Sequence, residues 1–268
     1  MQRIVQKFGG TSVGNISKIK KVCELIKKEF ENGNQVVVVS SAMSGETNKL
    51  VDLAENFDVT NNKKEYDMIV STGEQISIAL ISMALKEIGI LAKPLLGWQV
   101  PIIGSKEQTK AKINKIDNKL LLKIINNNEI PIIAGFQGVD DDDNIVTFGR
   151  GGSDTSAVAI AAAISADRCD IYTDVDGIYT CDPRMVSKAK KLERISYEEM
   201  LEFASLGAKV LQTRSVEMAM RHNVTVQVLS SQTGKKGTFL TKEDKKMENE
   251  LVSGIAYTKD EANITLIN

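Results

Sequence analysis

Short runs of apolar, β-branched residues alternate along the chain with longer stretches in which apolar residues recur every three or four positions. The first pattern is typical of buried strands and the second of amphipathic helices. Four consecutive valines at 36–39 predict a central parallel strand that is buried on both faces. The alternation predicts an α/β fold, a three-layer α/β/α sandwich with a mainly parallel central sheet. Strands are expected at 3–6, 36–39, 130–134, 170–173 and 224–229, and helices at 16–31, 66–88 (interrupted at 71–73), 154–165, 196–206 and 209–221.

The composition of the chain changes after about Gly234. Residues 235–250 are strongly charged and predict a surface linker, whereas residues 251–268 return to a strand-like pattern. We therefore divide the sequence into a large domain at 1–234, a charged linker at 235–250 and the start of a further domain at 251–268.

Charge and composition exclude several classes of protein. The formal net charge is -1, so no general positive field favours nucleic acid or an anionic membrane. The N-terminus lacks the pattern of a secretory signal, and no apolar run is expected to reach the roughly 20 residues of a membrane helix. Cys23, Cys169 and Cys181 are far apart, without the spacing of a disulfide or zinc framework. These features predict a cytoplasmic protein with reduced thiols, and neither nucleic acid nor membrane as partner.

Three loops that follow predicted strands carry the candidate chemistry. The first, at 7–12, combines Lys7 with the pair Gly9 and Gly10, where the first strand passes into the first helix. In an α/β fold ligands bind at this edge of the sheet, and glycine lets backbone N–H groups approach an anion. The pattern is neither GxxxxGK[ST] nor GxGxxG, and by itself it also fits a plain tight turn.

The second loop, at 148–156, places Arg150 before a double glycine, with an acidic residue at the start of the next helix. A guanidinium group binds a carboxylate in a bidentate manner. Ser153 or Asp154 also fits a simple helix N-cap, but that alternative leaves Arg150 and the glycines unexplained. The loop therefore predicts a binding site for a carboxylate.

The third loop, at 173–184, contains several acidic residues, an aromatic residue and a basic residue. Its Asp-Val-Asp-Gly segment suggests calcium, but it lacks the remaining ligands and the closing glutamate of an EF-hand loop. A nucleotide site fits better, with Tyr179 as a wall for the base and Arg184 directed towards phosphates.

Several segments in a fixed order carry a family resemblance. They are KFGGTSV at 7–13, VVVVSSAM at 36–43, STGEQIS at 71–77, AGFQG at 134–138, GRGGSDTSA at 149–157, YTDVDGIYTCDPR at 172–184 and GAKVLQTRSVE at 207–217. Together they resemble the aspartate kinases of the amino-acid kinase superfamily, over nearly the whole chain. The resemblance implies the amino-acid kinase fold and transfer of the γ-phosphoryl group of Mg-ATP to the β-carboxylate of L-aspartate. That reaction is the first step towards lysine, threonine, methionine and diaminopimelate.

The resemblance also implies a site for aspartate. Lys7 would stabilise the transferring phosphoryl group, and Asp154 would orient Lys7 rather than act as a base. Glu74 would pair with the ammonium group of aspartate, although a helix-surface acid is the alternative for this residue, and Arg150 would bind the α-carboxylate. The further residues expected at the aspartate site are Ser41, Thr47, Gly151, Gly152 and Ser153.

For the nucleotide, the resemblance implies binding of ATP and Mg²⁺. Magnesium is expected to be held by ATP oxygens and water, so no protein ligand is assigned. A carboxylate acceptor is ionised at neutral pH and needs no strong general base, which agrees with the presence of a single histidine, His222. The residues expected at the ATP site are Lys7, Phe8, Gly9, Gly10, Thr173, Asp174, Tyr179, Asp182, Arg184 and Lys209.

Members of this family normally continue into a pair of ACT regulatory domains, and residues 251–268 resemble the start of the first one. These residues are too few for that module, so we expect no direct feedback by lysine or threonine. A homodimer or a separate regulatory subunit are the expected partners besides aspartate and ATP. Two alternatives stay open: a related kinase for acetylglutamate, glutamate, carbamate or UMP, and an inactive remnant or non-catalytic subunit of an aspartate kinase assembly.

Overall fold

The computed structural model describes residues 1–206, 210–243 and 254–255. Its large sheet contains β1 Arg3–Phe8, β2 Gln35–Ser40, β3 Ala92–Leu95, β6 Ile130–Ala134, β9 Arg168–Thr173, β10 Arg194–Ser196, β11 Val226–Ser230 and β12 Thr238–Thr241. The strand order is β10-β12-β11-β9-β1-β2-β6-β3. Every pairing is parallel except that of β11 with β12. The predicted mainly parallel sheet is therefore confirmed.

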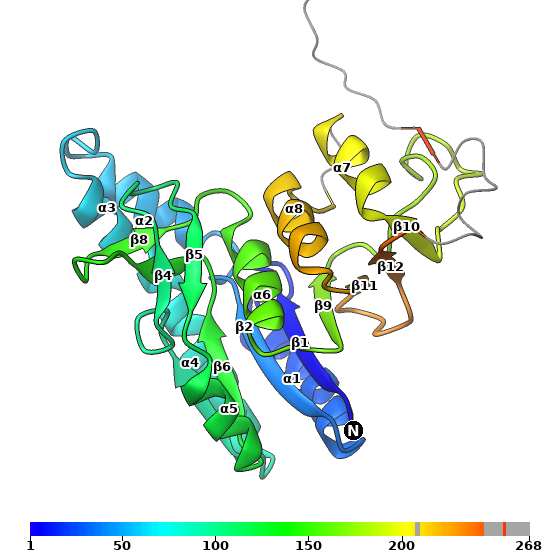
Figure 1. Cartoon of the computed structure of the whole chain (residues 1–268), viewed down its shortest axis with the longest axis horizontal. Helices are drawn as coiled ribbons and strands as arrows, with labels where there is room; N and C mark the ends of the chain where they lie inside the picture. The colour runs from blue at the N-terminus through cyan, green and yellow to red at the C-terminus, as the bar shows by residue number, and fades with distance from the viewer. Residues whose placement is uncertain (207–209, 244–253, 256–268) are drawn as a thin grey trace, which may run out of the picture.

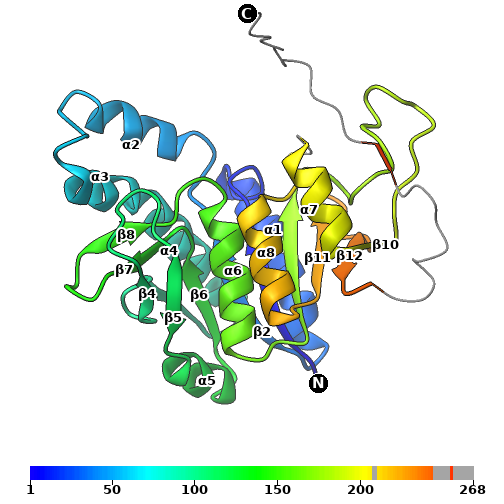
Figure 2. The ribbon, with the colours of Figure 1, turned by 45° about the horizontal axis from the view of Figure 1, so that its top comes forward.

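Helices cover both faces of this sheet (Figures 1 and 2). On one face lie α1 (Ile16–Glu31) and α4 (Thr72–Glu87), and on the other lie α5 (Lys119–Asn126), α6 (Gly152–Ala163) and α8 (Thr213–His222). Each face has its own cluster of buried apolar side chains. The α7 helix (Tyr197–Ser205) packs against α8. The three-layer α/β/α arrangement expected from the sequence is thus present.

The two helices next to β1 differ in how much of their surface is buried. In α1 one stripe is buried, formed by Ile19, Val22, Cys23 and Ile26, as its amphipathic pattern predicts. In α6 the first ten residues, 152–161, are all buried, because the helix lies against β1 and β9 and is covered by α8. Its many alanines and serines allow this close packing, since larger side chains would hold the helix away from the sheet.

A smaller four-stranded sheet and two short helices form a separate lobe at one end of the molecule (Figure 2). The strands are β4 Ile102–Gly104, β5 Ile113–Ile116, β7 Gln137–Val139 and β8 Ile145–Thr147, in the order β5-β4-β7-β8. The helices are α2 (Glu46–Ala54) and α3 (Lys63–Val70). The sequence did not predict these strands, because three or four residues are too few to show a period of two.

The apolar stretch at 66–88, expected as a helix interrupted at 71–73, consists of α3 and α4, which meet at Ser71. By length and composition, Lys63–Glu87 passes as a candidate membrane helix among the described residues, and half of its apolar 18-residue stretch is buried in the fold. The expectation that no apolar run reaches this length was wrong. The apolar residues of this segment pack inside the fold: Ile78, Ile81 and Leu85 of α4 belong to the core between α1 and the sheet.

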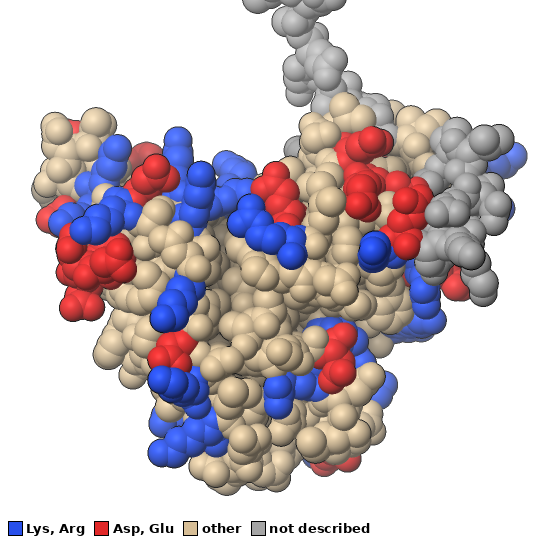
Figure 3. All heavy atoms as spheres, viewed as in Figure 1, with Lys and Arg blue, Asp and Glu red and all other residues tan. Residues whose placement is uncertain are grey.

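Charged side chains are distributed over the surface without a single dominant sign. On the face seen in Figure 3, basic and acidic residues lie interspersed. This distribution agrees with the net charge of -1. Recognition of a phosphate on this face would therefore depend on local groups rather than on a general field.

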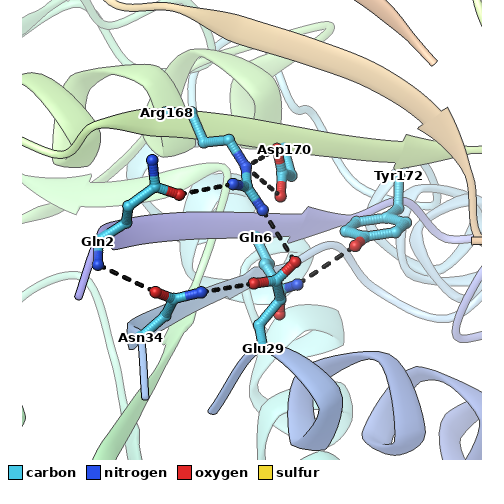
Figure 4. A network of polar contacts seen from close by, with 7 residues as sticks. All are labelled: Gln2, Gln6, Glu29, Asn34, Arg168, Asp170 and Tyr172. Atoms are coloured by element: carbon cyan, nitrogen blue, oxygen red, sulfur yellow. Dashed lines mark hydrogen bonds and ion pairs between the residues drawn. The ribbon is translucent and has the colours of Figure 1, made fainter. Parts of the chain in front are cut away.

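A polar network links α1 to the adjacent strands β1 and β9 (Figure 4). Arg168 contacts Glu29 at 2.9 Å and Asp170 at 3.0 Å. Burial raises the pKa of Asp170 to about 6, although the nearby guanidinium of Arg168 acts in the opposite direction. The side-chain amide of Gln6 donates to the hydroxyl of Tyr172 at 3.2 Å. The network therefore fixes α1 against β1, whose carboxyl end reaches the candidate site, and against the neighbouring strand β9.

Candidate active site

A cavity of about 320 Å³ lies at the carboxyl ends of β1 and β2, against the first turns of α4 and α6. The first two loops that the sequence singled out meet here, as expected for the carboxyl edge of an α/β sheet. The lining residues are Lys7, Gly10, Ser41, Ala42, Met43, Ser44, Gly45, Thr47, Asn48, Glu74, Phe136, Gly149, Arg150, Gly151, Gly152, Ser153 and Asp154.

Lys7 and Asp154 form an ion pair in the cavity, with Nζ and Oδ1 2.6 Å apart. Lys7 lies on the central strand β1 and Asp154 in the first turn of α6; they are 8% and 9% exposed. Charges this deeply buried need a partner, so each holds the other in place. The N-terminus of α6 adds the positive end of a helix dipole at the same point. This geometry can hold an anionic group next to a fixed ammonium group.

Glu74 is a buried acid in the first turn of α4, and it is 3% exposed. Its Oε1 accepts the backbone N–H of Ala42 at 3.1 Å, while its Oε2 has no hydrogen-bond partner. Burial raises the pKa of Glu74 to about 8, although backbone N–H groups act in the opposite direction. A buried carboxyl oxygen without a partner is costly to the fold, and a cation in the cavity would relieve that cost. The alternative of a helix-surface acid is wrong.

Hydrogen bonds hold the loop after β2 against α4 and against the end of β1. The hydroxyl of Ser77 donates to the carbonyl of Ser41 at 2.8 Å, and the N–H of Ser41 donates to the carbonyl of Phe8 at 3.0 Å. A Cβ atom at Gly73 would lie 2.8 Å from the Cβ of Ala42, so only glycine permits this approach. The contacts place Ser41 and Glu74 at one wall of the cavity, where Thr47 joins them from the first turn of α2.

Two glycines in the left-handed region flank Arg150 in the second loop. Gly149 has φ 70° and Gly151 has φ 71°, a conformation that other residues adopt at a cost. A Cβ atom at Gly151 would come within 2.2 Å of the Gln212 side chain. Gly151 is also the residue that begins α6 as its N-cap, so the alternative that Ser153 or Asp154 is the cap is wrong. The glycines therefore set the path that brings Arg150 to the cavity.

Phe8 and Gly9 were expected at the ATP site, but the Phe8 side chain and the Gly9 N–H group are both occupied within the protein. The Phe8 side chain is fully buried and stacks on Tyr172, with ring centroids 4.6 Å apart, so it packs in the core and cannot contact a ligand. The N–H of Gly9 donates to the carbonyl of Tyr172 at 3.2 Å and is already used within the protein. Gly10 does line the cavity, and a Cβ atom there would lie 2.8 Å from the carbonyl oxygen of Ala42.

The third loop does not line the cavity. Thr173 donates its hydroxyl to Asp174 at 3.0 Å directly after β9, and the Tyr179 hydroxyl donates to Asp176 at 2.9 Å. A further pair, Asp182 with Arg184, is 2.8 Å apart. Lys209 lies outside the described residues. The nucleotide site at this loop stays a prediction.

Seven residues line the cavity without having been predicted as site residues: Ala42, Met43, Ser44, Gly45, Asn48, Phe136 and Gly149. Phe136 has φ 68° and donates its N–H to the hydroxyl of Ser156 at 3.1 Å. A positive φ at a bulky residue is a strained conformation of the kind that gathers at functional sites. The segment AGFQG at 134–138 contains Phe136, but no role was assigned to the residue, because an aromatic residue after a buried strand reads as part of the core.

Comparison with known proteins places this geometry in a family. Residues 2–230 match the model of the amino acid kinase family. The aspartate kinase of Pseudomonas putida is 52% identical over 267 residues, which cover 99% of this chain and 65% of that protein. The aspartokinase of Rickettsia felis is 47% identical over 270 residues, covering 99% of this chain and 67% of that protein. The chain thus spans about two thirds of the length of these curated relatives.

A solved structure supports the same assignment. The structure of Escherichia coli aspartokinase III in complex with aspartate and ADP superposes with a TM-score of 0.81 at 29% sequence identity. The match covers 90% of this chain and 65% of that one. The chain belongs to the amino acid kinase family and, within it, to the aspartokinases.

Proposed function

We propose that this chain is the phosphotransfer domain of an aspartate kinase, transferring the γ-phosphoryl group of ATP to the β-carboxylate of L-aspartate. The observation that carries the proposal is the presence of Glu74 and Arg150 in one cavity with Lys7. An α-amino acid brings an ammonium group and an α-carboxylate, for which Glu74 and Arg150 are receptors of opposite charge. The β-carboxylate of aspartate is then available as the acceptor.

The chemistry needs little from the protein beyond position and charge. An oxygen of the β-carboxylate forms a bond to the γ-phosphorus, and the bond from that phosphorus to the β,γ-bridging oxygen breaks. The products are 4-phospho-L-aspartate and ADP, and no proton has to be removed from the acceptor. Lys7 offsets negative charge on the phosphoryl oxygens, while Asp154, 2.6 Å away, keeps Lys7 in place.

Nucleotide use is supported by the related E. coli structure, whose description names ADP beside aspartate. The ATP would extend from Lys7 and Gly10 towards the loop after β9, with Thr173, Asp174, Tyr179, Asp182, Arg184 and Lys209 as its expected contacts. Magnesium supplies charge neutralisation on the phosphates, held mainly by their oxygens and water. The product would enter the cytoplasmic route to lysine, threonine, methionine and diaminopimelate.

Trapping of the acyl phosphate tests this proposal directly. The protein is incubated with Mg-ATP and L-aspartate in the presence of hydroxylamine, and both hydroxamate and ADP are measured. We expect aspartate-dependent hydroxamate from the wild type, and a loss of at least about 100-fold in Lys7→Ala, because a group that stabilises transition-state charge is removed.

Matched controls use exposed residues of the same type. Lys20→Ala on α1 and Glu87→Gln on α4 change exposed side chains, and we expect both variants to keep wild-type turnover. Folded protein that binds ATP but yields no hydroxamate would contradict an autonomous kinase and favour a non-catalytic subunit. Hydroxamate formed from glutamate or acetylglutamate instead of aspartate would show that the acceptor is wrong.

A further inference from the structure

Asp67 holds two backbone segments that lead to the Arg150 loop. This residue of α3 is fully buried. Its Oδ2 accepts the N–H groups of Thr109 at 2.8 Å and of Thr147 at 2.9 Å. Its Oδ1 accepts the hydroxyl of Thr147 at 2.7 Å. One carboxylate therefore accepts from three donors, and Thr147 lies three residues before Arg150.

Arg214, on α8, holds the same two segments. This half-buried residue of α8 donates from Nη1 to the carbonyl of Phe148 at 2.6 Å and from Nη2 to the carbonyl of Ala111 at 2.9 Å. The planar guanidinium can reach both carbonyls at once because its N–H groups form a rigid fork. An unpaired buried carbonyl is costly, so the contact fixes where β8 ends and the loop begins.

Asp67 and Arg214 bind different backbone groups of the same pair of segments, 109–111 and 147–148. Segments 109–111 and 147–148 are joined by a hydrogen bond from the N–H of Ala111 to the carbonyl of Thr147 at 3.0 Å. Asp67 takes N–H groups from both segments, and Arg214 takes carbonyls from both. The chain then turns at Gly149, where an added Cβ atom would lie 3.0 Å from the carbonyl oxygen of Thr109.

We propose that Asp67 and Arg214 are positioning residues that hold the loop at 148–152, and with it Arg150, in the orientation that receives the α-carboxylate of the amino-acid substrate. The inference rests on the proposed function of the cavity. Neither residue lines the cavity, so both act through the backbone rather than on the substrate. We expect the two residues to affect binding of aspartate and not of ATP. The loop at 173–184, where ATP is expected to bind, makes no contact with segments 109–111 and 147–148 among the hydrogen bonds described above.

The first test is Arg214→Met, which keeps an unbranched apolar stem and removes both hydrogen bonds. We expect KM for aspartate to rise at least about tenfold, because small displacements of a binding group are costly. The KM for ATP and kcat at saturating aspartate are expected to stay within about twofold of the wild type. Arg214→Lys retains the positive charge but not the forked guanidinium, so its KM for aspartate should lie between those of the wild type and of Arg214→Met. Arg221→Met, an exposed position on the same helix, is the matched control.

The second test uses the conservative variant Asp67→Asn. The new amide would still accept both N–H groups through its oxygen and would donate to the Thr147 hydroxyl, so aspartate KM should stay within about threefold of the wild type. Asp67→Leu, which has a similar shape and no acceptor, should raise aspartate KM as Arg214→Met does. If the two variants at this position have the same aspartate KM, the hydrogen bonds of Asp67 do not position the loop.

Aspartate affinity is measured by calorimetry in addition to turnover. The proposed function and the proposed positioning role of Asp67 and Arg214 can then be refuted independently of each other. Absence of hydroxamate from the wild type would refute the function, while the ratio of aspartate affinities between wild type and variants would still decide the positioning role. Equal aspartate affinity in Arg214→Met and Arg221→Met would overturn the inference. A parallel change of both KM values and kcat would also overturn it, since that result indicates general loosening. If Arg214→Met does not fold, Arg214→Lys with wild-type affinity has the same meaning.

Discussion

Replacement of Glu74 by glutamine should stabilise the protein while weakening its affinity for aspartate. The wild-type carboxyl has an ordinary pKa of 4.5 and a folded-state pKa of about 8, because it is buried. In the unfolded chain at pH 7 it is ionised, so folding requires uptake of a proton. The cost is about 3 kcal/mol at pH 7. Glutamine does not carry this cost, and its Oε1 can still accept the N–H of Ala42.

The pH dependence has a definite sign. Since the folded-state pKa is raised, the contribution of Glu74 to stability is complete below pH 4.5 and is lost as the pH rises towards 8. The difference in unfolding free energy between Glu74→Gln and the wild type should therefore grow over this window and level off above it. Urea unfolding at pH 5, 7 and 8.5, with Glu87→Gln as control, measures the difference.

Substrate binding should show the opposite trend. An ammonium group binds the ionised form of Glu74, so binding of aspartate releases a proton below pH 8. In the wild type KM for aspartate should fall by up to about tenfold per pH unit as the pH rises towards 8. In Glu74→Gln it should be high and independent of pH in this range. A variant that is less stable than the wild type at pH 8.5, with unchanged aspartate KM, would refute this reasoning about Glu74.

Two further variants test other parts of the structure. Gly151→Ala places a side chain at φ 71° and against Gln212, so we expect a loss of at least about 1 kcal/mol of stability and a higher aspartate KM. The added change Gln212→Ala should recover part of both losses, and no recovery would show that the clash is not the cause. Ser196→Ala removes the capping box with Glu199 at the start of α7 and should cost about 1 kcal/mol in urea unfolding. Turnover should be unchanged, and a drop in kcat would link α7 to the site.

The sequence predicted the central strands and the two glycine-containing loops of the cavity for a physical reason. Parallel strands buried on both faces are nearly continuous apolar runs, and the residues after them must lie at one edge of the sheet. Arg150, Glu74 and Lys7 lie in one cavity as predicted, Glu74 on the strength of the family resemblance. Phe8 was assigned to the ATP site on the family resemblance alone, whereas its side chain packs on Tyr172 in the core.

The parts that the sequence did not predict depend on contacts between distant segments. Asp67 reads as an ordinary helix residue, and only the folded chain brings Thr109 and Thr147 to its carboxylate. The strained backbone of Phe136 likewise arises from the neighbouring loop and α6. Lys209 and all of 251–268 except 254–255 lie outside the described residues, so the predictions for them stay predictions.

The complete burial of α6 has a consequence for motion. A helix with ten consecutive buried residues cannot slide or tilt without displacing the sheet and α8 together. Asp154 and Lys7 therefore lie on a rigid part of the cavity lining. In α2, by contrast, only Ala54 is buried, and the helix begins after Gly45 at φ 85°, where nothing would contact an added Cβ atom. We therefore expect closure over bound substrates to involve α2 and Thr47 rather than the phosphoryl-binding groups Lys7 and Asp154.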